Sequence, residues 1–170
     1  MRDLAAMGAK AGALLKERGE RVAVAESSSG GLISAALLAV PGASAYYTAG
    51  GVVYTGRALK GLLAISRTDV AVQGLRSSSE PYAKFLAEAV RARHRVDWGV
   101  SETGAAGPTG NPYGDPPGHT CVGIAGPVLL TKTLRTGSSD RLANMWAFAE
   151  EALTLLVTAL ESAPKSTKQG

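Results

Sequence analysis

An α/β fold is predicted, in which a mixed, mainly parallel central sheet lies between two layers of helices as a three-layer α/β/α sandwich. Strand and helix patterns alternate through the first half of the chain, and such βαβ units require parallel strands with helices on both faces of the sheet. A hairpin pattern after residue 119 adds antiparallel strands at one side. The 170 residues suffice for one domain, which we expect over residues 1–163, with a polar tail at residues 164–170.

Each expected element has a local signal. Gly19 ends the first amphipathic helix, Pro41-Gly42 ends the second, Thr55 can cap a short third, and Ser79 begins a fourth. Helices are expected, in order, over residues 3–18, 30–40, 55–63, 79–94 and from 138 or 139 to 160. Strands are expected over residues 21–25, 51–54, 96–100, 120–125 and 128–133, with a glycine-rich loop over 103–118.

Composition limits the classes of function. Apolar residues make up 45% and the formal net charge is +4, but no basic stripe is interleaved with aromatics, so we expect no nucleic-acid partner. Cys121 is the only cysteine, which indicates a reducing, cytoplasmic compartment. The N-terminus lacks a signal-peptide pattern, and no apolar run reaches the roughly 18 residues of a membrane span. Abundant alanine and glycine with 5% aromatics predict close packing of helices on the sheet.

Two glycine-rich turns are the candidate ligand site. The turn Glu26-Ser27-Ser28-Ser29-Gly30-Gly31 follows a strand and begins a helix, where free N–H groups and the helix dipole favour an anion. The segment Thr103-Gly104-Ala105-Ala106-Gly107-Pro108 also follows a strand, so a parallel sheet would bring both turns to one edge. The alternatives are that the first turn only caps a helix and that the second is a surface loop.

Histidine and metal chemistry have little support. His94 falls at a helix end, where a capping role is simpler, and His119-x-Cys121 offers only two metal ligands. We therefore expect no metal. If Ser27 is a nucleophile, its base is more plausibly a lysine, and Lys60 is the nearest by topology. Lys60 could equally be a solvated surface lysine.

Several motifs in one order resemble a known family. They are the two turns above, Val40-Pro41-Gly42-Ala43-Ser44 and Val53-Tyr54-Thr55. Together, from about residue 6 to 160, they resemble the CinA C-terminal domain family of competence/damage-inducible proteins, which includes nicotinamide-nucleotide amidases. The resemblance implies an α/β/α fold and hydrolysis of nicotinamide mononucleotide to nicotinate mononucleotide and ammonia, without cofactor or metal.

The resemblance also implies roles for single residues. Ser27 matches the family's nucleophilic serine and Tyr54 its tyrosine, and the base would be Lys60 or another group. The family lysine, however, belongs five positions after the tyrosine, where this chain has Leu59. A later helix arginine is replaced by Met145. The residues expected to bind substrate are Glu26, Ser28, Ser29, Gly30, Gly31, Ser44, Thr103, Gly104, Ala106, Gly107 and Arg141.

Two hypotheses of different class follow. In the first, the protein is an amidase that uses Ser27, with Tyr54 and Lys60 assisting. In the second, the pocket binds a phosphorylated nucleotide or a similar small anion without this catalysis. Lys60 Nζ within about 3.5 Å of Ser27 Oγ would favour the first, and a solvent-facing Lys60 the second. The resemblance to the family and the small apolar faces predict a homo-oligomer. We expect no membrane partner, and no second domain of the kind that larger family members carry.

Overall fold

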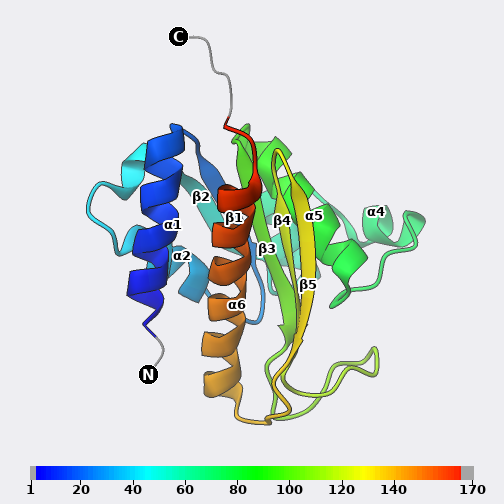
Figure 1. Ribbon diagram of the computed structural model, residues 1–170. Coiled ribbons are helices and arrows are strands. Elements are labelled where there is room, and N and C mark those ends of the chain that lie inside the picture. Colours follow the sequence, from blue (N-terminus) through cyan, green and yellow to red (C-terminus); the bar gives the residue numbers. More distant parts are fainter. Residues whose placement is uncertain (1–2, 166–170) are drawn as a thin grey trace.

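Five strands form one mixed sheet in the computed structural model, which describes residues 3–165. The spatial order is β2-β1-β3-β4-β5 (Figure 1). β1 pairs in parallel with β2 and β3, while β4 pairs antiparallel with β3 and β5, so every strand except β4 runs in one direction. The strands are β1 (Val22–Glu26), β2 (Tyr47–Val52), β3 (Trp98–Ala105), β4 (His119–Ala125) and β5 (Leu129–Arg135).

Helices cover both faces of this sheet, which confirms the three-layer α/β/α sandwich. On one face α1, α2 and α6 pack against each other, and α3 and α5 cover the other face. Figure 1 shows α1 and α6 in front of the sheet and α5 behind it. The helices are α1 (Leu4–Arg18), α2 (Leu32–Leu38), α3 (Gly56–Leu63), α4 (Arg67–Val72), α5 (Glu80–His94) and α6 (Arg141–Ser162), with a short 3-10 helix, η1 (Ala43–Ala45).

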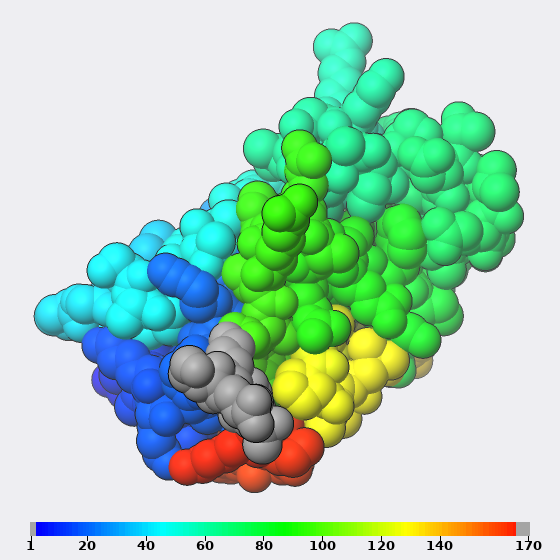
Figure 2. All heavy atoms as spheres, turned by 90° about the horizontal axis from the view of Figure 1, so that it is seen from above, coloured from blue at the N-terminus to red at the C-terminus, as the bar shows by residue number. Residues whose placement is uncertain are grey.

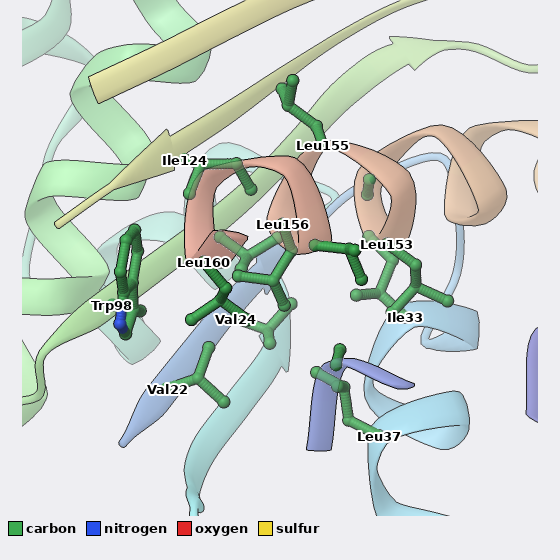
Figure 3. Close-up of a cluster of buried hydrophobic side chains, with 14 of the residues drawn as sticks. Val22, Val24, Ile33, Leu37, Trp98, Ile124, Leu153, Leu155, Leu156 and Leu160 are labelled. Atoms are coloured by element: carbon green, nitrogen blue, oxygen red, sulfur yellow. The ribbon is translucent and has the colours of Figure 1, made fainter. Parts of the chain in front are cut away.

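The larger core lies between the sheet and α1, α2 and α6 (Figure 3). Val22 and Val24 of β1 meet Leu156 and Leu160 of α6 there, and all four side chains are almost fully buried. Full burial of such a side chain stabilises the fold by about 1.5–3 kcal/mol. The stripe of apolar residues expected on the last helix is thus the surface that α6 presents to the sheet.

Small residues bring α5 close to the sheet on the opposite face. A Cβ at Gly99 of β3 would collide with the carbonyl oxygen of Ala87, and one at Gly123 of β4 with that of Ala83. Neither neighbour can give way because both are backbone atoms of α5. The close packing predicted from the alanine and glycine content is confirmed here.

The helix boundaries follow their expected caps. Thr55 accepts a hydrogen bond from the Ala58 amide, Ser79 accepts one from the Tyr82 amide, and Gly19 ends α1 in the left-handed conformation with φ 62°. The antiparallel hairpin of β4 and β5 is also as predicted. These signals are local, so the sequence was sufficient to locate them.

Three elements differ from expectation. β2 covers Tyr47–Val52 rather than 51–54, because its register starts with Tyr47 opposite Val22. β3 continues to Ala105, because Thr103 and Gly104 pair with β4 rather than beginning a loop. α4 was not anticipated, since none of its residues is buried and it has no apolar stripe.

The chain ends lie partly outside the described residues. Of the polar tail expected at 164–170, residues 166–170 are not among them. Within residues 3–165, no helix is both long and apolar enough to cross a membrane.

Candidate functional site

The two glycine-rich segments meet at the carboxyl edge of β1 and β3. The two strands are parallel, with Ala25 opposite Ser101. The turn after Glu26 therefore lies beside the C-terminal half of β3. That juxtaposition, expected from the alternation of strands and helices, is confirmed. Buried contacts between the segments define the shape of the site.

The Glu26 carboxylate lies at the start of α2, where an anionic ligand was expected. It is fully buried and accepts hydrogen bonds from five donors, at 2.6–3.0 Å. The donors are the amides of Gly31, Ile33 and Ser34 and the hydroxyls of Ser29 and Ser34. The expectation of free N–H groups at this helix start is therefore wrong, because the anion that they bind belongs to the protein.

Glu102 holds the same turn from β3. Its carboxylate, also fully buried, accepts from the amides of Ser27 and Ser29 at 3.1 and 2.8 Å. The hydroxyls of Ser28 and Thr120 donate to its other oxygen at 2.6 and 2.7 Å. The hydroxyls of Ser28 and Ser29, the amides of Ser29 and Gly31 and the Glu26 carboxylate thus hold the turn through bonds within the protein.

A cavity of about 450 Å³ opens beside Ser27, within the range of about 300–1,000 Å³ typical of small-molecule sites. Ser27 is only partly buried, and Tyr54, Thr103 and Gly104 also line the cavity, as predicted for residues around one ligand. Apolar side chains from α3, α4, α5 and the residues that follow β2 and α4 form much of the remaining wall. They are Val53, Leu59, Val70, Ala71, Leu75 and Leu86.

Lys60 does not reach this cavity. Leu59 lines it with a side chain only 4% exposed, whereas Lys60 is exposed to solvent and is not among the lining residues. The next residue of an α-helix is rotated by about 100°, so only one of the two positions can face Ser27. Lys60 as the base of Ser27 is therefore a wrong prediction for this geometry.

Two arginines of the cavity were not foreseen. Arg67 at the start of α4 and Arg76, just before α5, both line it. The capping box formed by Ser66 and Asp69 is readable as S-x-x-D and could have located α4, and with it Arg67. No local pattern points to Arg76, which is brought to the cavity by the segment between α4 and α5.

Arg141 joins a second cluster rather than the cavity wall. Its guanidinium donates to the Gly107 carbonyl at 2.6 Å and to the Tyr54 hydroxyl at 3.3 Å. Asn144 of the same helix donates to the Ala106 carbonyl at 2.7 Å. Arg141 and Gly107, both expected to bind substrate, are therefore hydrogen-bonded to each other, and Ala106 is bound by Asn144 of the same helix.

Two further expected residues lie elsewhere. Ser44 is at the opposite end of the sheet, where its carbonyl accepts from Arg21 just before β1, so its predicted contact with a ligand beside Ser27 is wrong. Gly30 adopts φ 65°, and a Cβ there would meet the Met145 side chain of α6. Its role is to let the turn pass under α6.

His119 and Cys121 form a buried pair next to the cavity. His119 Nε2 lies 2.8 Å from the Ser78 carbonyl, and Cys121 Sγ lies 3.7 Å from the same nitrogen. Burial raises the pKa of the Cys121 thiol, which disfavours the thiolate that binds metals. In the part of the chain that the structure describes, no three metal-ligating side chains gather.

The sequence match decides the family. Residues 4–160 match the profile of the CinA C-terminal domain. The chain belongs to this family. A CinA-like protein of Anaeromyxobacter sp. (strain Fw109-5) is 41% identical over 150 residues, which cover 87% of this chain and 36% of that protein. One from Chlorobium limicola is 39% identical over 148 residues, which cover 84% of this chain and 34% of that protein. The chain therefore spans about a third of the length of these curated relatives.

Solved CinA structures share the fold. The competence/damage-inducible protein CihA of Agrobacterium tumefaciens superposes with a TM-score of 0.83 at 28% identity, covering 95% of this chain and 98% of that one. A CinA superfamily protein of Enterobacter cloacae has a TM-score of 0.82 at 27% identity, covering 94% of each chain. The CinA fold therefore extends over nearly the whole chain.

Proposed function

We propose that this CinA domain binds a phosphorylated nucleotide or a similar small anion in the cavity beside Ser27, without the serine–lysine amide hydrolysis of the nicotinamide-nucleotide amidases that it resembles. The observation that carries the proposal is the position of two consecutive residues of α3. Leu59 lines the cavity, whereas Lys60 is exposed outside it. A leucine cannot take a proton from Ser27.

The other lining residues offer no replacement for the missing base. Among the described residues that line the cavity there is no lysine, histidine, aspartate or glutamate. Arginine stays protonated in proteins and cannot accept a proton. Burial raises the pKa of the Tyr82 phenol, so that this group keeps its proton at neutral pH. The nucleophile therefore lacks the adjacent base that serine chemistry requires.

Binding, by contrast, has the groups that it needs. The guanidinium groups of Arg67 and Arg76 can form paired hydrogen bonds to phosphate or carboxylate oxygens. Apolar side chains and the rings of Tyr54, Tyr82 and Tyr113 can contact an organic ring. This mixture of an apolar wall and a few polar groups is typical of small-molecule sites.

Amide hydrolysis is the second candidate, because the two matched family positions, Ser27 and Tyr54, line the same cavity. Titration calorimetry with nicotinamide mononucleotide and an ammonia assay on the same sample distinguish the two functions. We expect saturable binding and no more ammonia than Ser27→Ala releases. Turnover that Ser27→Ala abolishes would establish the amidase instead, and failure to bind any nucleoside monophosphate would contradict the proposal.

A further inference from the structure

Two carboxyl groups are buried beneath the Ser27 turn. The carboxylates of Glu26 and Glu102 are both fully buried there, and every hydrogen bond that they form in the described structure is accepted from an N–H or O–H group. The Ser27, Ser29, Gly31, Ile33 and Ser34 amides around the turn are therefore already used by these two side chains. A further anion placed against the same turn would find these donors already engaged.

Positive charge is concentrated on the wall formed by α4 and the segment after it. Arg67 and Arg76 line the cavity, and none of its described lining residues carries a carboxylate. Gly56, the first residue of α3, makes room for the Arg67 side chain, since a Cβ at Gly56 would collide with Arg67 Nε. α4 has no buried residue, and Figure 2 shows the segment around it standing out from the body of the molecule.

The two guanidinium groups differ in their protein partners. Arg76 Nη1 and Nη2 lie 2.6 and 3.4 Å from the Asp115 carboxylate, and the group lies 5.8 Å from the centre of the Tyr113 ring. Within residues 3–165 no carboxylate lies within ion-pair distance of Arg67. Arg67 is therefore the cation of the cavity whose charge is left for a ligand, with Arg76 beside it.

We propose that Arg67 and Arg76 form the anion subsite of the cavity, and that the ligand enters with its phosphate or carboxylate toward α4 and its uncharged end toward Ser27. The inference rests on the proposed function and adds an orientation to it. Sequence motifs place the anion at the Ser/Gly turn, whereas the two lining arginines place it at α4 and the segment after it. The ligand class is a phosphomonoester or carboxylate attached to an uncharged, partly apolar body that packs on Val53, Leu59 and Val70.

The test compares a phosphorylated probe with its unphosphorylated form. Nicotinamide mononucleotide and nicotinamide riboside are titrated into the full chain and into Arg67→Gln. A hydrogen bond between an arginine and a charged group contributes enough binding free energy that its loss should weaken mononucleotide binding about tenfold or more. Riboside binding should stay unchanged. Arg57→Gln is the matched control, because Arg57 lies on the neighbouring helix α3, is exposed and does not line the cavity.

Arg76 needs a paired variant because it also holds Asp115. Both Arg76→Gln and Asp115→Asn break that ion pair, but only Arg76→Gln removes the cation. We expect Arg76→Gln to lose more affinity for the mononucleotide than Asp115→Asn, because Asp115→Asn only loosens the loop beside the cavity while Arg76→Gln also removes a lining cation. Equal losses in both would show that Arg76 acts only through the ion pair and would overturn its place in the subsite.

Inorganic phosphate separates this inference from the proposed function. Inorganic phosphate should raise the temperature of thermal unfolding of the protein, compared with chloride at equal ionic strength. This increase should be lost in Arg67→Gln and kept in Arg57→Gln. That result supports the subsite even if the mononucleotide does not bind. If the mononucleotide binds and still has a higher affinity than the riboside in both Arg67→Gln and Arg76→Gln, the proposed function stands and the subsite is overturned. The subsite is equally overturned if neither phosphate nor the mononucleotide has any effect.

Discussion

Leu59 and Lys60 are consecutive residues of α3, and a rotation of about 100° separates the directions of their side chains. Leu59 packs with the smaller core formed by α3, α5 and the sheet and contributes to the cavity wall, while Lys60 is exposed. The distance along the chain from Tyr54 to the lysine differs from the family spacing by one residue. On a helix this small difference is sufficient to remove the amine from Ser27.

Leu59→Lys should therefore return an amine to the cavity. At a position only 4% exposed, desolvation would lower the pKa of the new lysine, so that its neutral form could take the Ser27 proton. We expect ammonia release from nicotinamide mononucleotide in this variant and none in Leu59→Lys/Ser27→Ala. Lys60→Leu is the control and should leave binding unchanged. A folded Leu59→Lys variant that binds the mononucleotide but releases no ammonia would show that more than the base is missing.

Among the elements, the loop over residues 106–118 depends on Asp115 for its position. Asn111 donates to the Asp115 carboxylate at 2.8 Å and accepts from the Asp115 amide at 3.1 Å, and Arg76 reaches the same carboxylate from the segment before α5. Arg76, Asn111 and Tyr113 all line the cavity. The contact between the loop and this segment therefore forms one side of the ligand site.

Acid should release this loop. The Arg76 guanidinium, with the Asn111 amide, holds the pKa of the Asp115 carboxyl below its ordinary value. A lowered pKa means that the stabilisation is complete above the unfolded-state value of about 3.9 and is lost as the pH falls through the lower, folded-state value. Because Arg76 is partly exposed, we expect about 1 kcal/mol or less.

Asp115→Asn tests this pH dependence. Its free energy of unfolding should be lower than that of the parent at pH 7, and the difference should shrink once the pH falls below about 3.9. Urea denaturation across this range measures it, with the exposed Glu88→Gln of α5 as a control that should show no such change. A difference that stays constant with pH would mean that Asp115 stabilises the loop without its charge.

At the scale of the whole molecule, a buried ionic cluster stabilises the end of the sheet opposite the cavity. Arg18 contacts the fully buried Glu20 at 2.7 Å, and Trp98 at the start of β3 donates to the same carboxylate at 2.6 Å. Arg18 also donates to the carbonyls of Leu160 and Ala163 at the end of α6. The cluster thus connects α1, the start of β3 and the last helix.

Arg18→Ala should destabilise the fold strongly without changing the ligand site. Removing the guanidinium leaves the Glu20 carboxylate in the interior without its cation, which costs about 3–5 kcal/mol. Urea unfolding measures the loss, and Arg93→Ala, an exposed position of α5, should change stability by about 0.5 kcal/mol or less. Binding of nicotinamide mononucleotide at a temperature where the variant is folded should match the parent. A loss close to that of Arg93→Ala would contradict the role of the cluster.

Much of this architecture could be predicted from residues that are close together in the chain. Helix caps such as Thr55 and Ser79, the stop at Gly19 and the alternation of strands and helices act over a few residues. The α/β/α fold and the meeting of the two turns could therefore be predicted from the pattern. α4 was missed because it is short and exposed, and hydrophobic periodicity detects only helices that bury a face.

The chemistry of the site depended instead on residues that are distant in the chain. Glu102 reaches the Ser27 turn across 75 positions, and Arg67 and Arg76 come from α4 and the segment after it. A motif records which groups follow a strand, but not which charges the fold places beside them. Electrostatic interactions act through space, so only the tertiary structure showed that the turn is already bound to carboxylates and that Arg67 and Arg76 form the positive wall. It also showed that Leu59 rather than Lys60 lines the cavity beside Ser27.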